Sequence, residues 1–159
     1  MQRPLPDLGP RGEGYVAIQF VLFAVIALAG LLGPAWGGAL RPVTDVAGAA
    51  LIAAGGLLAL RGVLDLGDSL TVVPRPRDRA RLVERGSYAL VRHPIYGGLV
   101  VAAVGWGLAT ASPVAVLAGV VLGAFFDLKS RREEGWLEER YAGYATYRAR
   151  TRRLIPWLY

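Results

Sequence analysis

The sequence has 159 residues, of which 54% are hydrophobic, and its formal net charge is +6. It contains no cysteine and one histidine, which excludes disulfides, thiolate metal sites, a cysteine nucleophile and a zinc site built on paired histidines. The length suits a single domain, and the clustering of apolar residues into blocks favours an integral membrane protein. Basic clusters alternate with those blocks, so we interpret them as cytosolic loops and not as a nucleic-acid surface.

Four apolar blocks predict membrane-spanning helices. The blocks comprise residues 15–32, 46–60 (extendable to Leu64), 95–110 and 113–126. The last two are each short for a complete span, so a shallow hairpin is an alternative. We favour two full helices, because a helical pattern continues beyond Phe126 to Leu137 and predicts a last helix that protrudes from the membrane.

The arginines predict the orientation. A connector (residues 69–85) and the basic tail must share one side of the membrane, and the positive-inside rule makes that side the cytosol. The loop at Arg41 and the turn at Ser112 then face the other side. We therefore expect an all-α integral membrane bundle of about four transmembrane helices in the cell (inner) membrane. Both termini, the connector and the protruding C-terminal helix would be cytosolic.

The segment around the only histidine is the first candidate for a site. Arg92 and His93 supply cationic and titratable donors, and Tyr88 and Tyr96 each supply an aromatic face and a hydroxyl. Pro94 is well placed as the first residue of a helix, because its missing N–H would have no partner there. The pattern predicts a polar cluster at the mouth of a membrane helix.

Two consecutive carboxylates, Glu133 and Glu134, lie on the predicted protruding helix. One interpretation is a solvated face with charge pairs four residues apart. The other is a pair of carboxylates that hold ribose hydroxyls or an ammonium group. Because the connector and this helix leave the membrane on the same side, His93 and Glu133 could share one pocket.

Tyrosines and arginines follow in the tail. Tyr141, Tyr144 and Tyr147 recur every three residues, which predicts one face of a helix and fits an aromatic belt at the membrane interface. The arginines of residues 148–153 fit either an anchor to anionic headgroups or a site for a ligand carboxylate or phosphate.

Together these residues resemble the isoprenylcysteine carboxyl methyltransferase family and, more loosely, the membrane phospholipid methyltransferases. The resemblance covers roughly residues 66–157. The matching residues are Leu82, Val83, Gly86, Tyr88, the Arg92-His93-Pro94-X-Tyr96 core with Gly98, Glu133, Glu134, Leu137, Tyr144, Tyr147 and the closing Arg153-X-X-Pro156.

The resemblance implies S-adenosylmethionine as the methyl donor, held between the connector and the protruding helix. It divides the single domain (residues 1–159) into an N-terminal helical hairpin (1–65) and a cofactor-binding core (66–159). The residues that it implies as cofactor contacts are Leu82, Val83, Tyr88, His93, Pro94, Ile95, Tyr96, Glu133 and, in a helping role, Glu134.

The acceptor is less well defined by the resemblance. The eukaryotic enzymes carry a substrate-binding arginine four residues before the first glutamate, and here that position is Lys129, which keeps the charge without the bidentate fork. A carboxylate acceptor needs only a cation to orient it, for which Arg92, Lys129 or a tail arginine such as Arg153 would serve. An amine or thiol acceptor would need a proton acceptor, such as His93 or a glutamate. We expect a lipophilic or small apolar acceptor that reaches the site from membrane lipid, and no metal or nucleic-acid partner.

Two alternatives stay open from the sequence. A membrane sterol or enone reductase would bind NADPH in place of S-adenosylmethionine, since such enzymes look like this family at their C-terminal ends. A non-catalytic membrane scaffold would tolerate alanine at Arg92, His93 and Glu133 with no loss beyond stability.

Overall fold

The computed structural model describes residues 6, 8–71, 73, 75, 81–156 and 158. Apart from one isolated β-bridge, every regular element in these residues is helical, which confirms the predicted all-α class. Short 3₁₀ turns cover Gly38–Leu40, Gly67–Ser69 and Gly86–Ala89. The α-helices are α1 (Glu13–Leu32), α2 (Arg41–Leu66), α3 (Pro94–Ala109), α4 (Pro113–Arg140) and α5 (Tyr144–Arg150).

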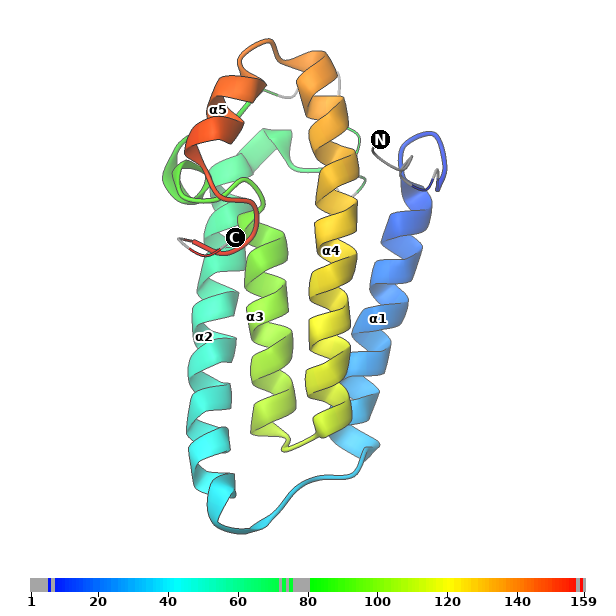
Figure 1. Cartoon of the computed structure of the whole chain (residues 1–159), viewed down its shortest axis with the longest axis vertical. Coiled ribbons are helices and arrows are strands. Elements are labelled where there is room, and N and C mark those ends of the chain that lie inside the picture. The colour runs from blue at the N-terminus through cyan, green and yellow to red at the C-terminus, as the bar shows by residue number, and fades with distance from the viewer. Residues whose placement is uncertain are drawn as a thin grey trace.

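The four long helices run side by side and form the bundle (Figure 1). Among the described residues, α1, α2 and α4 are long and apolar enough to cross a membrane, whereas α3 is an apolar helix of 16 residues. The start of α1, the end of α2, the start of α3 and the end of α4 lie at one end of the bundle (Figure 1). We call this end, which also carries α5, the polar end. The sequence analysis also predicted that the connector and the C-terminal tail lie at the same end.

The turn between α3 and α4 lies at the opposite end, at the predicted residues. Ala111 has a φ of 52°, and Ser112 caps α4 by accepting a hydrogen bond from the backbone N–H of Ala115 at 3.2 Å. Pro113 then begins α4, where its missing N–H has no cost. The two helices expected on either side of this turn are present, and α3, with 16 residues, is shorter than the three helices that are long enough to cross a membrane.

The contact between α2 and α3 is built on glycine. Gly48, Gly55 and Gly62 recur every seven residues and are the buried residues of α2. A Cβ at Gly55 would collide with the backbone of α3 at Gly98 and Ala102, so only glycine lets the two backbones approach this closely. Small residues commonly supply this kind of packing where lipid surrounds the helices, because lipid offers no hydrophobic drive for association.

Helix α1 is attached to the bundle in another way. Its residue Ile26 packs in a core cluster with Ala103, Ala118, Leu122 and Phe126 of α3 and α4. The side chains of Trp106 and Ser112 also donate hydrogen bonds to the backbone carbonyls of Ile26 and Ala29 in α1.

The C-terminal segment closes back on the start of α3. The backbone N–H groups of Arg92 and His93 donate to the carbonyls of Arg152 and Arg153 at 2.8 and 2.9 Å. The chain then passes so close to Gly97 that a Cβ there would collide with the carbonyl of Leu154. The segment thus fixes the backbone of the Arg-His-Pro motif at the polar end.

Two predictions about the polar end need comment. The expectation that Tyr141, Tyr144 and Tyr147 share one helix face is wrong, because α4 ends at Arg140 and α5 begins at Tyr144. Tyr141 therefore lies in the link between the two helices. Of the predicted connector, residues 72, 74 and 76–80 lie outside the described residues.

Candidate functional site

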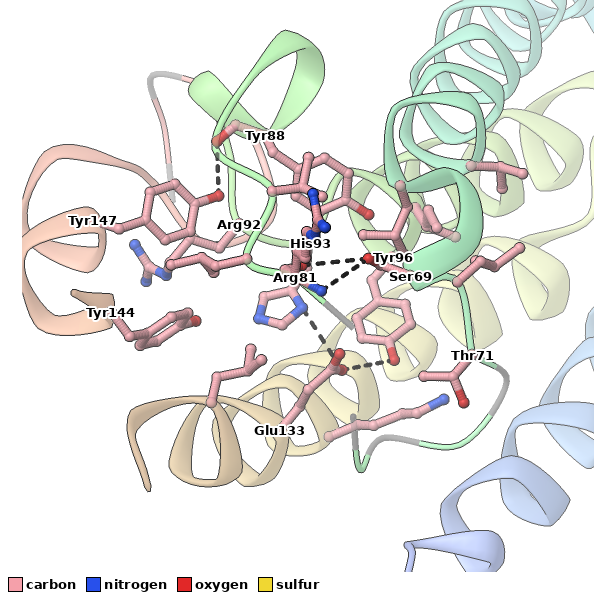
Figure 2. A pocket seen from close by; sticks show the side chains of 18 of the residues that line it. Ser69, Thr71, Arg81, Tyr88, Arg92, His93, Tyr96, Glu133, Tyr144 and Tyr147 are labelled. Atoms are coloured by element: carbon pink, nitrogen blue, oxygen red, sulfur yellow. Dashed lines mark hydrogen bonds and ion pairs between the residues drawn. The ribbon is translucent and has the colours of Figure 1, made fainter. Parts of the chain in front are cut away.

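A cavity of about 280 Å³ opens at the polar end, between the connector, the ends of α2 and α4, and α5 (Figure 2). Near the lower end of the usual range of roughly 300–1,000 Å³, this volume suits a small-molecule site. The residues that line it are Gln19, Val63, Leu66, Ser69, Leu70, Thr71, Arg81, Leu82, Val83, Tyr88, Arg92, His93, Ile95, Tyr96, Leu99, Lys129, Glu133, Leu137, Tyr141, Tyr144 and Tyr147.

Two stacked rings, those of His93 and Tyr96, line one wall of the cavity, and the ring of Phe126, which is not part of the lining, continues the stack. The His93 and Tyr96 rings are parallel within 2°, with centroids 5.4 Å apart, and the Tyr96 ring stacks in turn on Phe126 at 4.6 Å. His93 can stack in this way because it precedes Pro94, the first residue of α3, and Tyr96 follows within the first turn. The stack holds the imidazole in place by packing, and His93 is 6% exposed.

Glu133 presents its carboxylate to this wall (Figure 2). The Tyr96 hydroxyl donates a hydrogen bond to Glu133 Oε2 at 2.9 Å, and His93 Nδ1 lies 3.8 Å from the same oxygen. The Glu133 side chain is 20% exposed, so it is half-buried and accessible from the cavity. The sequence-based expectation that His93 and Glu133 share one pocket agrees with this geometry.

Glu134, the next residue, is buried behind the cavity wall. Its Oε1 accepts from Arg92 Nε at 2.8 Å and from Arg153 Nε at 3.3 Å. His93 Nε2 lies 3.4 Å from the same oxygen, without the geometry of a hydrogen bond. Two arginines and a histidine thus surround one carboxylate that is 3% exposed, and the interpretation of Glu134 as part of a solvated face is wrong.

Arg92 acts as a brace in this network. Besides Glu134, its guanidinium donates to the carbonyls of Arg148 and Thr151, which lie at the end of α5 and just beyond it. Arg153 likewise donates to Asp127 at 2.8 Å. Both arginines are therefore held by protein groups that tie the C-terminal segment to α3 and α4.

Lys129 has a different environment on the same helix. It is 1% exposed, its Nζ lies 4.8 Å from the centroid of the Tyr96 ring, and it donates to Gln19 Oε1 of α1 at 2.6 Å. Within the part of the chain that the structure describes, Lys129 has no acidic partner at ion-pair distance. Its charge therefore faces the cavity with no described acidic group at ion-pair distance.

Buried tyrosines close the cavity on the side of α5. Tyr147 donates its hydroxyl to the carbonyl of Tyr88 at 2.7 Å, which ties α5 to the turn before the Arg-His-Pro motif (Figure 2). Burial raises the pKa of Tyr88, Tyr144 and Tyr147, so their hydroxyls stay protonated at neutral pH. The hydroxyl of Tyr144 is buried and has no hydrogen-bond partner among the described residues, so it is available to a ligand.

The structure brings most of the predicted site residues together and places three elsewhere. Arg92 and Lys129 both line the cavity, although only Lys129 keeps a cation without an acidic partner. Pro94, Glu134 and Arg153 do not line it. The predicted cofactor contacts that do line it are Leu82, Val83, Tyr88, His93, Ile95, Tyr96 and Glu133.

The sequence analysis assigned Tyr141, Tyr144 and Tyr147 to an aromatic belt and not to the cavity wall, and it missed four further polar residues of that wall. Ser69, Thr71 and Arg81 belong to the connector, where composition alone does not distinguish a lining residue from a solvated one. Gln19 is the fourth, and its signal was visible as the single interruption of the first apolar block. A polar side chain within a membrane helix is a candidate for a functional role.

The described residues contain no group of three His, Asp or Glu side chains that could hold a metal ion. The polar groups of the cavity instead fit an organic ligand with both polar and aromatic surfaces.

Comparisons with known proteins place these observations in a family. The phospholipid methyltransferase family model matches residues 43–143, which is more than half of the chain and leaves α1 outside the match. The chain is also similar to the protein-S-isoprenylcysteine O-methyltransferase B of Arabidopsis thaliana, with 28% identity over 115 residues. That similarity covers 70% of this chain and 58% of the relative, so the chain spans less than two thirds of the relative's length.

Proposed function

The chain belongs to the phospholipid methyltransferase family, and we propose that it transfers a methyl group from S-adenosylmethionine to a lipophilic acceptor that carries a carboxylate. The observation that carries this proposal is the pair of opposite charges on the cavity wall. Glu133 offers a carboxylate at one point, and one helical turn away Lys129 offers a cation that has no ion pair with any described acidic group.

The donor site is supported by the groups around Glu133. A carboxylate suits the ammonium or the ribose hydroxyls of S-adenosylmethionine, and the aromatic faces of Tyr88 and Tyr96 suit a base or a sulfonium. The Tyr144 hydroxyl, which has no hydrogen-bond partner among the described residues, supplies a further hydrogen-bonding group. When bound, S-adenosylmethionine would supply an electrophilic methyl group on a positively charged sulfur.

The protein's own part in such a reaction is to bind, align and exclude water. A carboxylate acceptor is already a nucleophile, so no side chain has to remove a proton from it. The apolar side chains of the wall, such as Leu82, Val83 and Ile95, keep the reacting groups away from water. Arg92 holds the backbone of the motif in place through its bonds to Glu134 and the C-terminal segment.

Lys129 favours a carboxylate acceptor over an amine. Its buried ammonium would repel a protonated amine and attract an anion, and the low exposure of the site strengthens both effects. The name of the Arabidopsis relative, an isoprenylcysteine O-methyltransferase, points to the same kind of acceptor for that protein. We propose that the cavity faces the cytosol at the inner membrane, since the arginine-rich connector and tail lie at its end of the bundle.

Calorimetric titration of S-adenosylmethionine into the detergent-purified protein tests this proposal. We expect micromolar binding, which a His93→Ala, Glu133→Ala double variant loses. The matched control is Arg41→Ala, Asp45→Ala, which removes an exposed ion pair at the opposite end of the bundle and should leave binding unchanged. Binding of NADPH without binding of S-adenosylmethionine would contradict the proposal and favour a reductase.

A further inference from the structure

Helix α1 is fixed along its axis by two side chains from other elements. Trp106 Nε1 donates to the carbonyl of Ile26 at 3.2 Å, and Ser112 Oγ donates to the carbonyl of Ala29 at 2.8 Å. Both bonds come from residues at or near the turn opposite the polar end. Gln19 precedes Ile26 by seven residues, or about 10 Å of helix, and this places it at the level of the cavity.

At that level, Gln19 is the hydrogen-bond partner of Lys129. An ammonium has three donors, and here one of them is satisfied by the neutral amide oxygen of Gln19 at 2.6 Å. The rings of Tyr96 and Phe126 flank the same ammonium, with centroids 4.8 and 5.7 Å away. A buried cation without a counterion is costly, so this position in the cavity favours an anion.

The nearest alternative partner of Lys129 on its own helix is Glu133, one turn further along. Residues four apart on a helix readily form ion pairs, and such a pair would neutralise both groups. Glu133 instead accepts a hydrogen bond from the Tyr96 hydroxyl, and Lys129 donates to Gln19 of α1. The amide of Gln19 thus keeps the two opposite charges apart, so that each can meet a different ligand.

We propose that Gln19 is a positioning residue for Lys129, and that α1 thereby completes the part of the cavity that selects an anionic acceptor. This inference rests on the proposed function, because it assigns the acceptor to the same cavity. It also gives α1 a role, although α1 lies outside the residues that the family model matches.

The sequence makes a direct test possible, because Lys129 is its only lysine. Protein labelled with ¹⁵N-lysine gives one side-chain ammonium signal, which can be titrated with oleate as a lipophilic carboxylate and with oleamide as its neutral counterpart. We expect oleate to shift the Lys129 signal and oleamide to leave it unchanged. Gln19→Glu should weaken the response to oleate at least tenfold, because the new carboxylate takes the place of the acceptor's.

Two variants of Gln19 separate positioning from charge. Gln19→Glu holds the Lys129 ammonium in place, so the affinity for S-adenosylmethionine should stay within twofold of the wild type. Gln19→Leu releases the ammonium to pair with Glu133, so the affinities for oleate and for S-adenosylmethionine should both fall. Trp106→Phe is the structural control, since it loosens α1 at Ile26 without touching Lys129, and it should keep the response to oleate.

The outcomes distinguish this inference from the proposed function. A Gln19→Glu protein that responds to oleate within twofold of the wild type would overturn the role of Gln19. If oleate does not shift the Lys129 signal of a wild-type protein that binds S-adenosylmethionine, the inference of an anionic acceptor is wrong and the donor site is unaffected. A wild-type protein that responds to oleate but does not bind S-adenosylmethionine would instead overturn the proposed function.

Discussion

Glu133 and Glu134 are neighbours on α4, yet their carboxylates have opposite surroundings. Glu134 is surrounded by Arg92, Arg153 and His93 and lies outside the cavity lining. Glu133 receives one hydrogen bond from Tyr96 and faces the cavity. Because consecutive helical residues point about 100° apart, one glutamate braces the fold while the other is left for a ligand. A carboxylate whose hydrogen-bonding positions are filled by protein groups has a structural role here, whereas one that keeps open positions is available for binding.

The largest effect is expected when the Glu134 carboxylate, the partner of Arg92, is removed. Glu134→Ala leaves the buried Arg92 guanidinium without its carboxylate, and we expect the free energy of unfolding to fall by about 3–5 kcal/mol. Thermal unfolding in detergent measures this loss. Glu133→Ala is the matched control, and a loss of equal size in that variant would erase the distinction between the two residues.

The converse change should affect binding and not stability. Glu133→Gln keeps the shape of the side chain and removes its charge, so we expect the affinity for S-adenosylmethionine to fall by about 1.5–3 kcal/mol of binding free energy. Calorimetry measures the affinity, and the unfolding temperature should match that of the wild type. Unchanged affinity would show that Glu133 does not bind the donor.

A smaller effect should follow from a conservative substitution of Arg92. Arg92→Lys keeps the charge but loses the fork that bonds Glu134 together with the carbonyls of Arg148 and Thr151. We expect the free energy of unfolding to fall by about 1–2 kcal/mol, with some of the hydrogen bonds retained. If the acceptor affinity fell while stability stayed the same, Arg92 would belong with the binding groups.

The smallest effect is expected at the far wall of the cavity. Tyr144→Phe removes a buried hydroxyl that has no hydrogen-bond partner among the described residues, so folding should lose nothing. If that hydroxyl donates to S-adenosylmethionine, the affinity should fall about fivefold, close to 1 kcal/mol. A loss of stability without a loss of affinity would assign a structural role to the Tyr144 hydroxyl.

Much of the fold could be predicted from the sequence, because the apolar blocks and their breakers are local signals. Pro94 begins α3 and Pro113 begins α4, and the turn at Ala111 and Ser112 lies where the apolar blocks are interrupted. The break between α4 and α5 was missed, since the regular spacing of the tyrosines fits a continuous helix.

The site was predictable only in part, because the sequence does not show which charges neutralise one another. Glu133 and Glu134 look equivalent as a motif, and their difference arises from Arg92 and from Arg153 in the returning C-terminal segment. Gln19 could not be placed either, since a helix that is apolar all round does not reveal which face meets its neighbours. Such long-range pairings need the folded chain.

A crystal structure of the protein with S-adenosylhomocysteine, grown from a lipid phase, tests most directly whether Glu133 binds the ligand while Glu134 holds the fold. We predict that the ligand lies in the cavity between the connector and α4, with its amino or ribose hydroxyl groups hydrogen-bonded to Glu133 and with Glu134 still bound to Arg92. A ligand bound elsewhere, or one that reaches Glu134 in place of Glu133, would contradict these roles of the two glutamates.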